Sequence, residues 1–296
     1  MTPRPAEAGK SAAAAQAVEP LAIVCGGGVL PVLVARKVAE SGRPVVLFPL
    51  RGFADPAFVS SYRHHWMALA SYGRFCRLMR AEGCRDLVVI GALVRPALRE
   101  LRLDWGTLRV LPRIARAFRG GDDHLLTGVA EFLEDDGFRL VGAHQVCPDI
   151  LVGGGPLGAR QPSTRDAEDI AIGMRLLAAT SPFDIGQAVV VADRHVLAVE
   201  GIEGTDAMLA RVAALRAEGR IRAPKGRGVL VKAPKLSQDR RLDLPTIGPR
   251  TVEGVATAGL AGLAVAAGGV ILAEPQDAAR KADAAAIFVV GVEGAA

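Results

Sequence analysis

Short apolar runs alternate with longer amphipathic stretches through the first half of the chain. A short apolar run bounded by turn residues predicts a buried strand, and apolar residues at helical spacing predict a helix. Strands that alternate with helices are typical of parallel βαβ units. The predicted strands are Leu21–Cys25, Pro44–Leu50, Asp86–Ile90 and Phe138–Ala143, and the predicted helices are Leu30–Ser41, Arg74–Glu82, Leu98–Phe118 and Asp123–Asp136.

The second half continues this alternation but contains one predicted hairpin. The turn Asp193-Arg194-His195 separates two apolar runs, which predicts an antiparallel pair. The run AGLAGLAVAAGGVILA at 258–273 is too short and too rich in glycine for a membrane span, so it predicts a buried helix that breaks at Gly268-Gly269 and continues as a strand. The other predicted elements are the strands Gln187–Ala192, Val196–Glu200, Gly228–Lys232 and Ile287–Val292 and the helices Arg165–Ala179, Thr205–Glu218 and Thr251–Ala266.

Glycine and proline concentrate between the two halves, in PDILVGGGPLGARQP at 148–162, which predicts a linker. The predicted fold class is therefore α/β with two domains. An N-terminal Rossmann-like parallel sheet covers 21–147, a linker covers 148–164, and a C-terminal α/β domain with a mixed sheet covers 165–296. Residues 1–20 are rich in alanine and proline and lack the apolar core of a signal peptide, so they predict a disordered tail.

Composition supports this fold and narrows the function. Hydrophobic residues make up 50% of the chain but aromatic residues only 4%, which suits Ala-rich helices packed on a parallel sheet. The net charge of +5 is compatible with nucleic acid, anionic lipid or phosphorylated substrates, or with a genome's preference for arginine codons. Few aromatics and no basic stripe interleaved with them argue against a nucleic-acid-binding module.

The cysteines predict neither zinc binding nor a disulfide framework. Cys25, Cys76, Cys84 and Cys147 form no Cys-x-x-Cys pair, and the histidines are not at zinc-ligand spacing. Scattered cysteines in a chain of this length indicate the cytoplasm.

The first candidate binding motif is GGGVLP at 26–31, between a predicted strand and a predicted helix. Glycines there allow a phosphate or ribose to approach backbone N–H groups at a helix N-terminus, which makes Gly27, Gly28 and Leu30 candidates for substrate binding. The motif departs from the dinucleotide fingerprint, so a nucleotide-cofactor oxidoreductase is the weaker alternative. A tight turn without a ligand is an equally open interpretation.

Two further motifs in the first half carry charged candidates. Arg95 follows the strand Asp86–Ile90, where ligands of open α/β sheets bind, and it is a candidate phosphate ligand or a surface arginine. Asp122 fits the N-cap of a helix, and Asp123 favours its first turn; both are also candidates for substrate binding.

Carboxylates gather where a strand gives way to a helix in the second half. Glu200, Glu203 and Asp206 span a glycine-broken turn and form a candidate site for a hard cation. Mg²⁺ usually takes one or two carboxylates and leaves its other positions to water and phosphate oxygens. Thr205 is either an N-cap or a substrate ligand, and the amide of Gln187 is placed to face the same cleft.

The densest charge lies in VLVKAPKLSQDRRLDLPTIG at 229–248. Lys232 and Lys235 could neutralise phosphate charge, and Asp239 and Asp243 flank Arg241. A proline and a glycine argue against a helix, so a loop holds these side chains, as is common for catalytic groups. The alternative is a solvated surface turn.

Taken together, GGGVLP, GALVRP, GDDHLL, DIGQAVVV, EGTDAM, LVKAPK and DRRLDLPTIG resemble, in this order, the LpxI family of UDP-2,3-diacylglucosamine pyrophosphatases in lipid A synthesis. The resemblance covers nearly everything after residue 20. It implies two domains with the ligand between them, a divalent metal, usually Mg²⁺, and hydrolysis to UMP and 2,3-diacylglucosamine 1-phosphate (lipid X). It also implies a lipid-linked substrate, which the protein meets at the cytoplasmic face of the inner membrane. No nucleic-acid partner is expected, and a homodimer is left open.

The resemblance also implies roles for particular residues. Asp243 matches the family's essential aspartate and is expected to bind metal or to orient the attacking water, while Asp239 falls where relatives carry an acidic residue. No Ser-His-Asp or Cys-His order stands out, so we expect no covalent intermediate. The predicted catalytic residues are Asp243, Asp239, Lys232 and Arg241, the metal ligands are Asp243, Glu200, Glu203 and Asp206, and the substrate ligands are Gly27, Gly28, Leu30, Arg95, Asp122, Asp123, Gln187, Thr205, Lys235 and Thr246.

Overall fold

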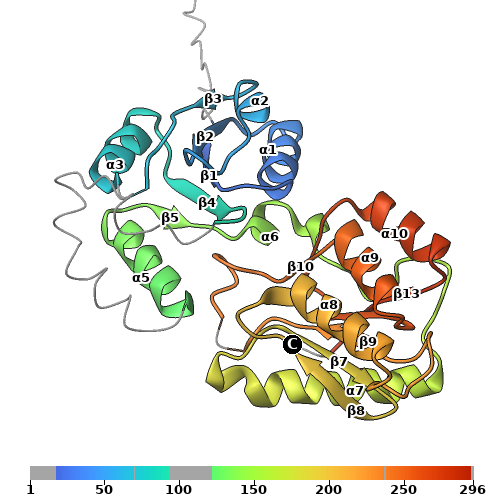
Figure 1. Ribbon diagram of the computed structural model, residues 1–296. Coiled ribbons are helices and arrows are strands. Elements are labelled where there is room, and N and C mark those ends of the chain that lie inside the picture. Colours follow the sequence, from blue (N-terminus) through green and yellow to red (C-terminus); the bar gives the residue numbers. More distant parts are fainter. Residues whose placement is uncertain (1–17, 70, 94–121, 237, 295–296) are drawn as a thin grey trace, which may run out of the picture.

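A computed structural model of the chain describes residues 18–69, 71–93, 122–236 and 238–294 (Figure 1). The predicted helix Leu98–Phe118 and the side chain of Arg95 lie outside these residues. Asp122 and Asp123 lie in a described helix, but their side chains do not belong to the described part.

The first sheet has five strands, all parallel, in the order β3-β2-β1-β4-β5. Helices lie on both faces, so its central strands are continuous apolar runs, as the sequence indicates. This confirms the Rossmann-like sheet. The strands are β1 (Leu21–Cys25), β2 (Val45–Pro49), β3 (Arg63–His64), β4 (Asp86–Ile90) and β5 (Arg139–Leu140), and the helices are α1 (Leu30–Glu40), α2 (Pro56–Val59), α3 (Tyr72–Ala81), α5 (Asp122–Asp135) and α6 (Ala143–Val146).

Alternate residues of β1 enter different cores, because successive side chains of a strand point to opposite faces. Leu21 and Ile23 pack with Val34 of α1 on one face. Ala22 packs with Met79 of α3 on the other. The sheet is thus the middle layer of three.

The second sheet has six strands in the order β6-β13-β11-β9-β7-β8 and is mixed. Strands β9, β11 and β13 are parallel, whereas β7 runs antiparallel to β8 and β9, and β6 antiparallel to β13. The mixed sheet is therefore confirmed. Its strands are β6 (Gly155–Pro156), β7 (Ala188–Ala192), β8 (His195–Val199), β9 (Val229–Lys232), β11 (Gly262–Ala266) and β13 (Phe288–Val292).

Helices cover both faces of this sheet as well. Helix α7 packs on one face through Ile170 and Leu177, and the other three helices pack on the opposite face (Figure 1). A short parallel pair, β10 with β12, lies apart from the sheet. The helices are α7 (Thr164–Thr180), α8 (Gly204–Ala217), α9 (Pro249–Thr257) and α10 (Pro275–Ala284), the short strands are β10 (Thr246–Ile247) and β12 (Ile271–Leu272), and the 3₁₀ turns are η2 (Pro148–Ile150) and η3 (Ser181–Phe183).

The predicted helix Thr251–Ala266 is wrong in its second half. Helix α9 ends at Thr257, the chain turns at Gly259 with φ +67°, and β11 follows. A strand buried on both faces shows no alternation, so its apolar run has the same pattern as a buried helix. Gly268-Gly269 accordingly lies in the turn between two strands. The predicted strand Phe138–Ala143 is also shorter, because α6 begins at its last residue.

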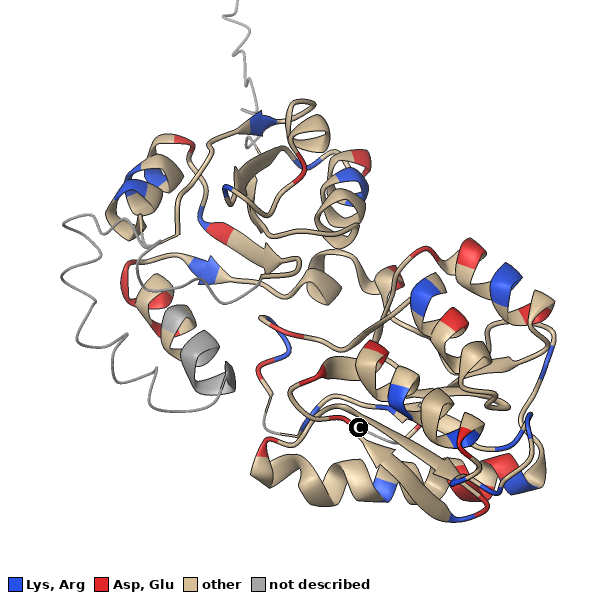
Figure 2. Cartoon of the chain, in the orientation of Figure 1, with Lys and Arg blue, Asp and Glu red and all other residues tan. Residues whose placement is uncertain are grey.

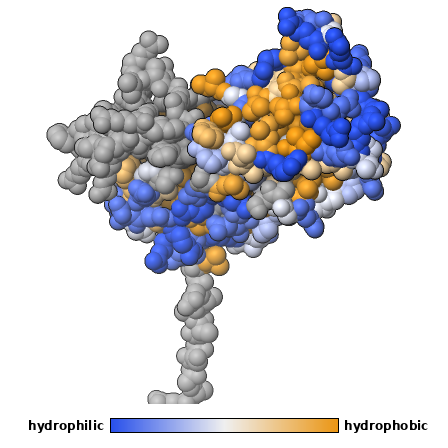
Figure 3. Space-filling model, turned by 90° about the horizontal axis from the view of Figure 1, so that it is seen from below, coloured by the Kyte–Doolittle hydropathy of each residue, from blue (hydrophilic) through white to orange (hydrophobic). Residues whose placement is uncertain are grey.

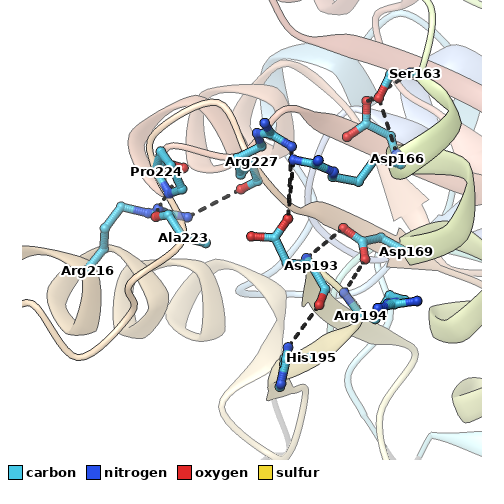
Figure 4. A network of polar contacts seen from close by, with 11 residues as sticks. Ser163, Asp166, Asp169, Asp193, Arg194, His195, Arg216, Ala223, Pro224 and Arg227 are labelled. Carbon is cyan, nitrogen blue, oxygen red and sulfur yellow. Dashed lines mark hydrogen bonds and ion pairs between the residues drawn. The ribbon is translucent and has the colours of Figure 1, made fainter.

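A polar network fixes the end of the second sheet at the β7–β8 hairpin (Figure 4). Asp193 and Arg194 have φ of 49° and 65°, as a two-residue hairpin turn of this type requires. The buried carboxylate of Asp169 on α7 accepts hydrogen bonds from both turn N–H groups, at 3.0 and 2.7 Å. A buried acceptor bonded to two backbone donors offsets the cost of left-handed backbone at residues other than glycine.

The segment between β9 and β10 connects the two halves of the molecule. Leu244 packs into the core beside α1 and β1. Arg241 Nη1 lies 2.6 Å from Glu134 Oε1 of α5. In Figure 2 this segment carries acidic and basic residues side by side where it extends toward the N-terminal half. The charge-rich loop is therefore part of the contact between the two domains, and not only a solvent-exposed turn.

Candidate functional site

Three strand ends of the second sheet meet at one place. Ala188 of β7 pairs with Lys232 of β9, and Val189 pairs with Val199 of β8. The antiparallel register therefore places the beginning of β7 beside the ends of β8 and β9. Gln187, Glu200 and Lys232, which are far apart in sequence, become neighbours for this reason.

A chain of hydrogen bonds holds Lys232. Its Nζ donates to Thr205 Oγ1 at 2.7 Å, and Thr205 Oγ1 donates to Glu200 Oε1 at 2.7 Å. The second oxygen of Glu200 accepts from the backbone N–H of Gln187 at 2.9 Å. Lys232 is only 8% exposed. Thr205 is not an N-cap, since Glu203 takes that position, so its hydroxyl is used in the site.

Burial lowers the pKa of Lys232, while the charges of Glu200, Asp206 and Asp243 oppose this shift. The three carboxylates are thus close enough to act on one ammonium group. A buried cation surrounded by carboxylates at the ends of strands is a common feature of sites that bind charged ligands.

Asp243 is held by two amide side chains. Gln238 Nε2 donates to Asp243 Oδ2 at 2.5 Å, and Gln187 Nε2 lies 3.4 Å from the same oxygen. Gln187 Nε2 also donates to Gln238 Oε1 at 3.2 Å. The structure thus brings Asp243 and Gln187 together with Gln238, a buried residue that the sequence interpretation missed. A neutral glutamine within a charge-rich loop gave no indication of its role.

Asp239 and Arg241 form a pair with each other. Arg241 donates to both carboxylate oxygens of Asp239, at 2.8 Å from Nη2 and 3.0 Å from Nε. This bonding lowers the pKa of Asp239 and raises that of Arg241. Since Arg241 also pairs with Glu134, the two predicted catalytic residues anchor the loop to α5.

The predicted carboxylate cluster is not present in the described part of the chain. Glu203 pairs with Arg211 at 2.8 Å, and Asp206 pairs with Arg250 at 2.7 Å. No group of three or more histidine, cysteine, aspartate or glutamate residues in the described ranges could hold a metal ion. Glu203 and Asp206 are thus each paired with an arginine, from α8 and α9, whereas Glu200 is bonded to Thr205 and Gln187.

Other predicted ligands lie around this centre or in the first sheet. Lys235 Nζ pairs with Asp184, beside η3. Thr246 begins β10, and its hydroxyl lies 3.4 Å from the carbonyl of Leu244. Leu30 begins α1, whose first turn has no side-chain cap.

The glycine motif is explained in part by packing. Gly27 exchanges backbone hydrogen bonds with Ala92, at 2.9 and 2.8 Å. A Cβ on Gly26 would lie only 2.7 Å from the carbonyl oxygen of Ala92. Gly28 has φ +90°, which favours glycine. The turns after β1 and β4 therefore need glycine to pack together, whether or not a ligand binds there.

These features define a class of protein: a two-domain α/β protein with a glycine turn above a parallel sheet and a lysine–aspartate–amide site on a mixed sheet. The sequence profile of the LpxI N-terminal domain matches residues 20–150, and that of the LpxI C-terminal domain matches residues 153–290. The chain belongs to the LpxI family.

One relative and one solved structure complete the comparison. UDP-2,3-diacylglucosamine pyrophosphatase LpxI of Caulobacter vibrioides is 40% identical over 273 residues, which cover 92% of this chain and 97% of the relative. The crystal structure of UDP-glucose 4-epimerase from Thermotoga maritima with UDP-glucose is 10% identical and covers 49% of this chain and 42% of that one. Its TM-score of 0.28 is too low to support any argument.

Proposed function

We propose that this protein hydrolyses the pyrophosphate of UDP-2,3-diacylglucosamine to UMP and 2,3-diacylglucosamine 1-phosphate, a step of lipid A biosynthesis. The observation that carries the proposal is the 40% identity to the Caulobacter pyrophosphatase along nearly the whole of both chains. The oxidoreductase alternative rested on the glycine turn, and packing against Ala92 accounts for its first glycine.

The site has the groups that this reaction needs. Hydrolysis of a phosphoanhydride depends mainly on neutralising phosphate charge and on placing a water molecule. Lys232, buried and held by Thr205, would stabilise charge on the phosphate oxygens. The carboxylate of Asp243, oriented by two amides, would orient the attacking water. Gln187 and Lys235 would bind the substrate beside them.

The described residues fit Mg²⁺ only if the protein supplies one or two carboxylates and the other ligands are water and phosphate oxygens. The donors around Lys232 are all oxygen or nitrogen groups, and no three carboxylates converge. Mg²⁺ often binds through one or two carboxylates together with substrate phosphates, so Asp243 would hold it together with the phosphate oxygens of the substrate, since Asp206 is paired with Arg250. When bound, the ion would neutralise charge on the pyrophosphate. Glu200 is occupied by Thr205 and Gln187 and is better suited to holding Lys232.

We expect activity to be lost in EDTA and restored by Mg²⁺. The reason is that the phosphate charge exceeds what one buried lysine can neutralise. The measurement is UMP release from UDP-2,3-diacylglucosamine with chelator, and then with Mg²⁺ added in excess. Full activity in chelator, with elemental analysis showing that no metal remains, would contradict the role of the metal.

We also propose that the protein contacts the cytoplasmic face of the inner membrane without crossing it. In the described part of the chain, no helix is both long and apolar enough to span a bilayer. Phe183, Ile185, Ile202 and Leu236 are large, exposed apolar residues on the loops that surround the site. Seen from the side where α7 lies, the surface carries a patch of hydrophobic residues bordered by hydrophilic ones (Figure 3).

The protein should sediment with anionic phosphatidylglycerol vesicles and be released by salt, because the net charge is +5. Serine at both Phe183 and Leu236 should weaken sedimentation severalfold. Val196→Ser is the matched control, because Val196 is exposed at the other end of β8, near the hairpin turn. Equal sedimentation with neutral and anionic vesicles, or an equal effect of all these changes, would count against this surface.

A further inference from the structure

The Gln238 side chain is buried and makes three hydrogen bonds. It is 7% exposed, although it lies in the charge-rich loop. Its Oε1 accepts from the backbone N–H of Lys235 and from Gln187 Nε2, both at 3.2 Å. Its Nε2 donates to Asp243 Oδ2 at 2.5 Å.

These bonds permit only one orientation of the amide. Two donors face Oε1, so the NH₂ group must face the carboxylate of Asp243, which only accepts hydrogen bonds. Reversing the amide would place NH₂ against two donors and the carbonyl oxygen against a carboxylate. The loop backbone at Lys235 therefore fixes the orientation of Gln238, and Gln238 in turn fixes Asp243.

We infer that Gln238 is a positioning residue, which holds the carboxylate of Asp243 in its working orientation beside Lys232. This inference rests on the proposed function, because it assigns Asp243 to that reaction. A neutral amide suits the task, since it restrains a carboxylate without cancelling the charge that must act on water or a cation. Arginine in this place would form an ion pair, as Arg241 does with Asp239.

Charged groups reach this site from several elements. Lys232 faces the site from β9, Glu200 from the end of β8, and Asp206 from α8. The contacts to Asp243 Oδ2 come instead from two neutral amides, those of Gln187 and Gln238. The amide bond from Gln187, at 3.4 Å, is longer than usual, so Gln238 is the stronger restraint of the two amides.

The test is Gln238→Met, which keeps the length of the side chain but removes its donor and acceptor, beside Gln276→Met on the exposed side of α10 as control. We expect kcat to fall at least about tenfold, KM to change less than about threefold, and the control to behave as wild type. A purely structural role would lower the melting temperature without this division between kcat and KM. An unchanged kcat in a folded Gln238→Met protein would overturn the inference.

A second measurement does not depend on activity. The side-chain amide resonances of Gln238, assigned by their loss in Gln238→Met, should shift in ¹H–¹⁵N spectra of Asp243→Ala, because a charge-assisted hydrogen bond is removed. Unshifted resonances would overturn the inference. If wild type fails to hydrolyse the substrate, the proposed function fails, and these spectra still decide whether Gln238 binds Asp243.

Discussion

Replacing Asp243 with alanine should lower turnover at least about a hundredfold and leave the fold intact, as removal of a catalytic electrostatic group commonly does. Asp243 lies in an ordered polar site, with Gln238 and Gln187 bonded to one of its oxygens. If the loop were only a solvated turn, the change would alter stability by about half a kcal/mol and activity hardly at all. Steady-state rates and melting temperature distinguish these outcomes.

Substrate binding by the Asp243→Ala protein should persist and could improve, because a carboxylate near a pyrophosphate repels it. Asp239→Ala is the matched control, since it removes an aspartate of the same loop whose partner is Arg241. We expect this change to loosen the contact with Glu134 and to reduce activity less than Asp243→Ala. Near-normal turnover in a folded Asp243→Ala protein would show that the loop is a surface turn.

Lys232→Met should also lower kcat by about a hundredfold, because the charges of Glu200, Asp206 and Asp243 all act on this buried ammonium group, which would stabilise charge on the phosphate oxygens. Stability should fall, since removing the cation leaves the buried carboxylate of Glu200 without its counter-charge, although methionine fills a similar volume. The measurements are kcat, KM and melting temperature.

Lys235→Met is the control for that change. Lys235 lies three residues further along and pairs with Asp184 outside the strand ends, so we expect it to raise KM more than it lowers kcat. A Lys232→Met protein with wild-type kcat would contradict the role of Lys232. Equal loss in both variants would indicate a general effect of positive charge.

Much of the fold follows from the sequence because buried parallel strands are short apolar runs. Strand β4 (Asp86–Ile90) was predicted to the residue. The prediction failed where the same property makes strand and helix indistinguishable, as in β11. The two-residue strands β10 and β12 have no period to detect, and they form only because the rest of the fold brings Thr246 beside Ile271.

The site was predictable in its residue types but not in its pairings. The sequence indicated Lys232 and Asp243, because a strand end and a charge-rich loop are typical locations for such groups. It could not show that Glu203 and Asp206 have arginine partners, since Arg250 lies 44 residues from Asp206. Nor could it indicate Gln238, whose importance comes from burial and orientation rather than charge.

The charge density of the loop has two separate causes in the structure. Asp239 and Arg241 join it to Glu134 of the N-terminal half. Asp243, with Gln238, faces the ends of the strands of the second sheet. Neither a surface turn nor an active-site loop describes this segment fully, because the same segment joins the two domains and holds the carboxylate of Asp243 at the site.

The central claim is that this protein splits the pyrophosphate of UDP-2,3-diacylglucosamine, and phosphorus NMR of the reaction tests it most directly. With wild type and Mg²⁺, the account predicts that the diphosphate resonances disappear and two monophosphate resonances, from UMP and 2,3-diacylglucosamine 1-phosphate, grow in equal amounts. With Asp243→Ala the diphosphate should persist. Intact diphosphate with wild-type protein, or equal cleavage by both proteins, would contradict the account.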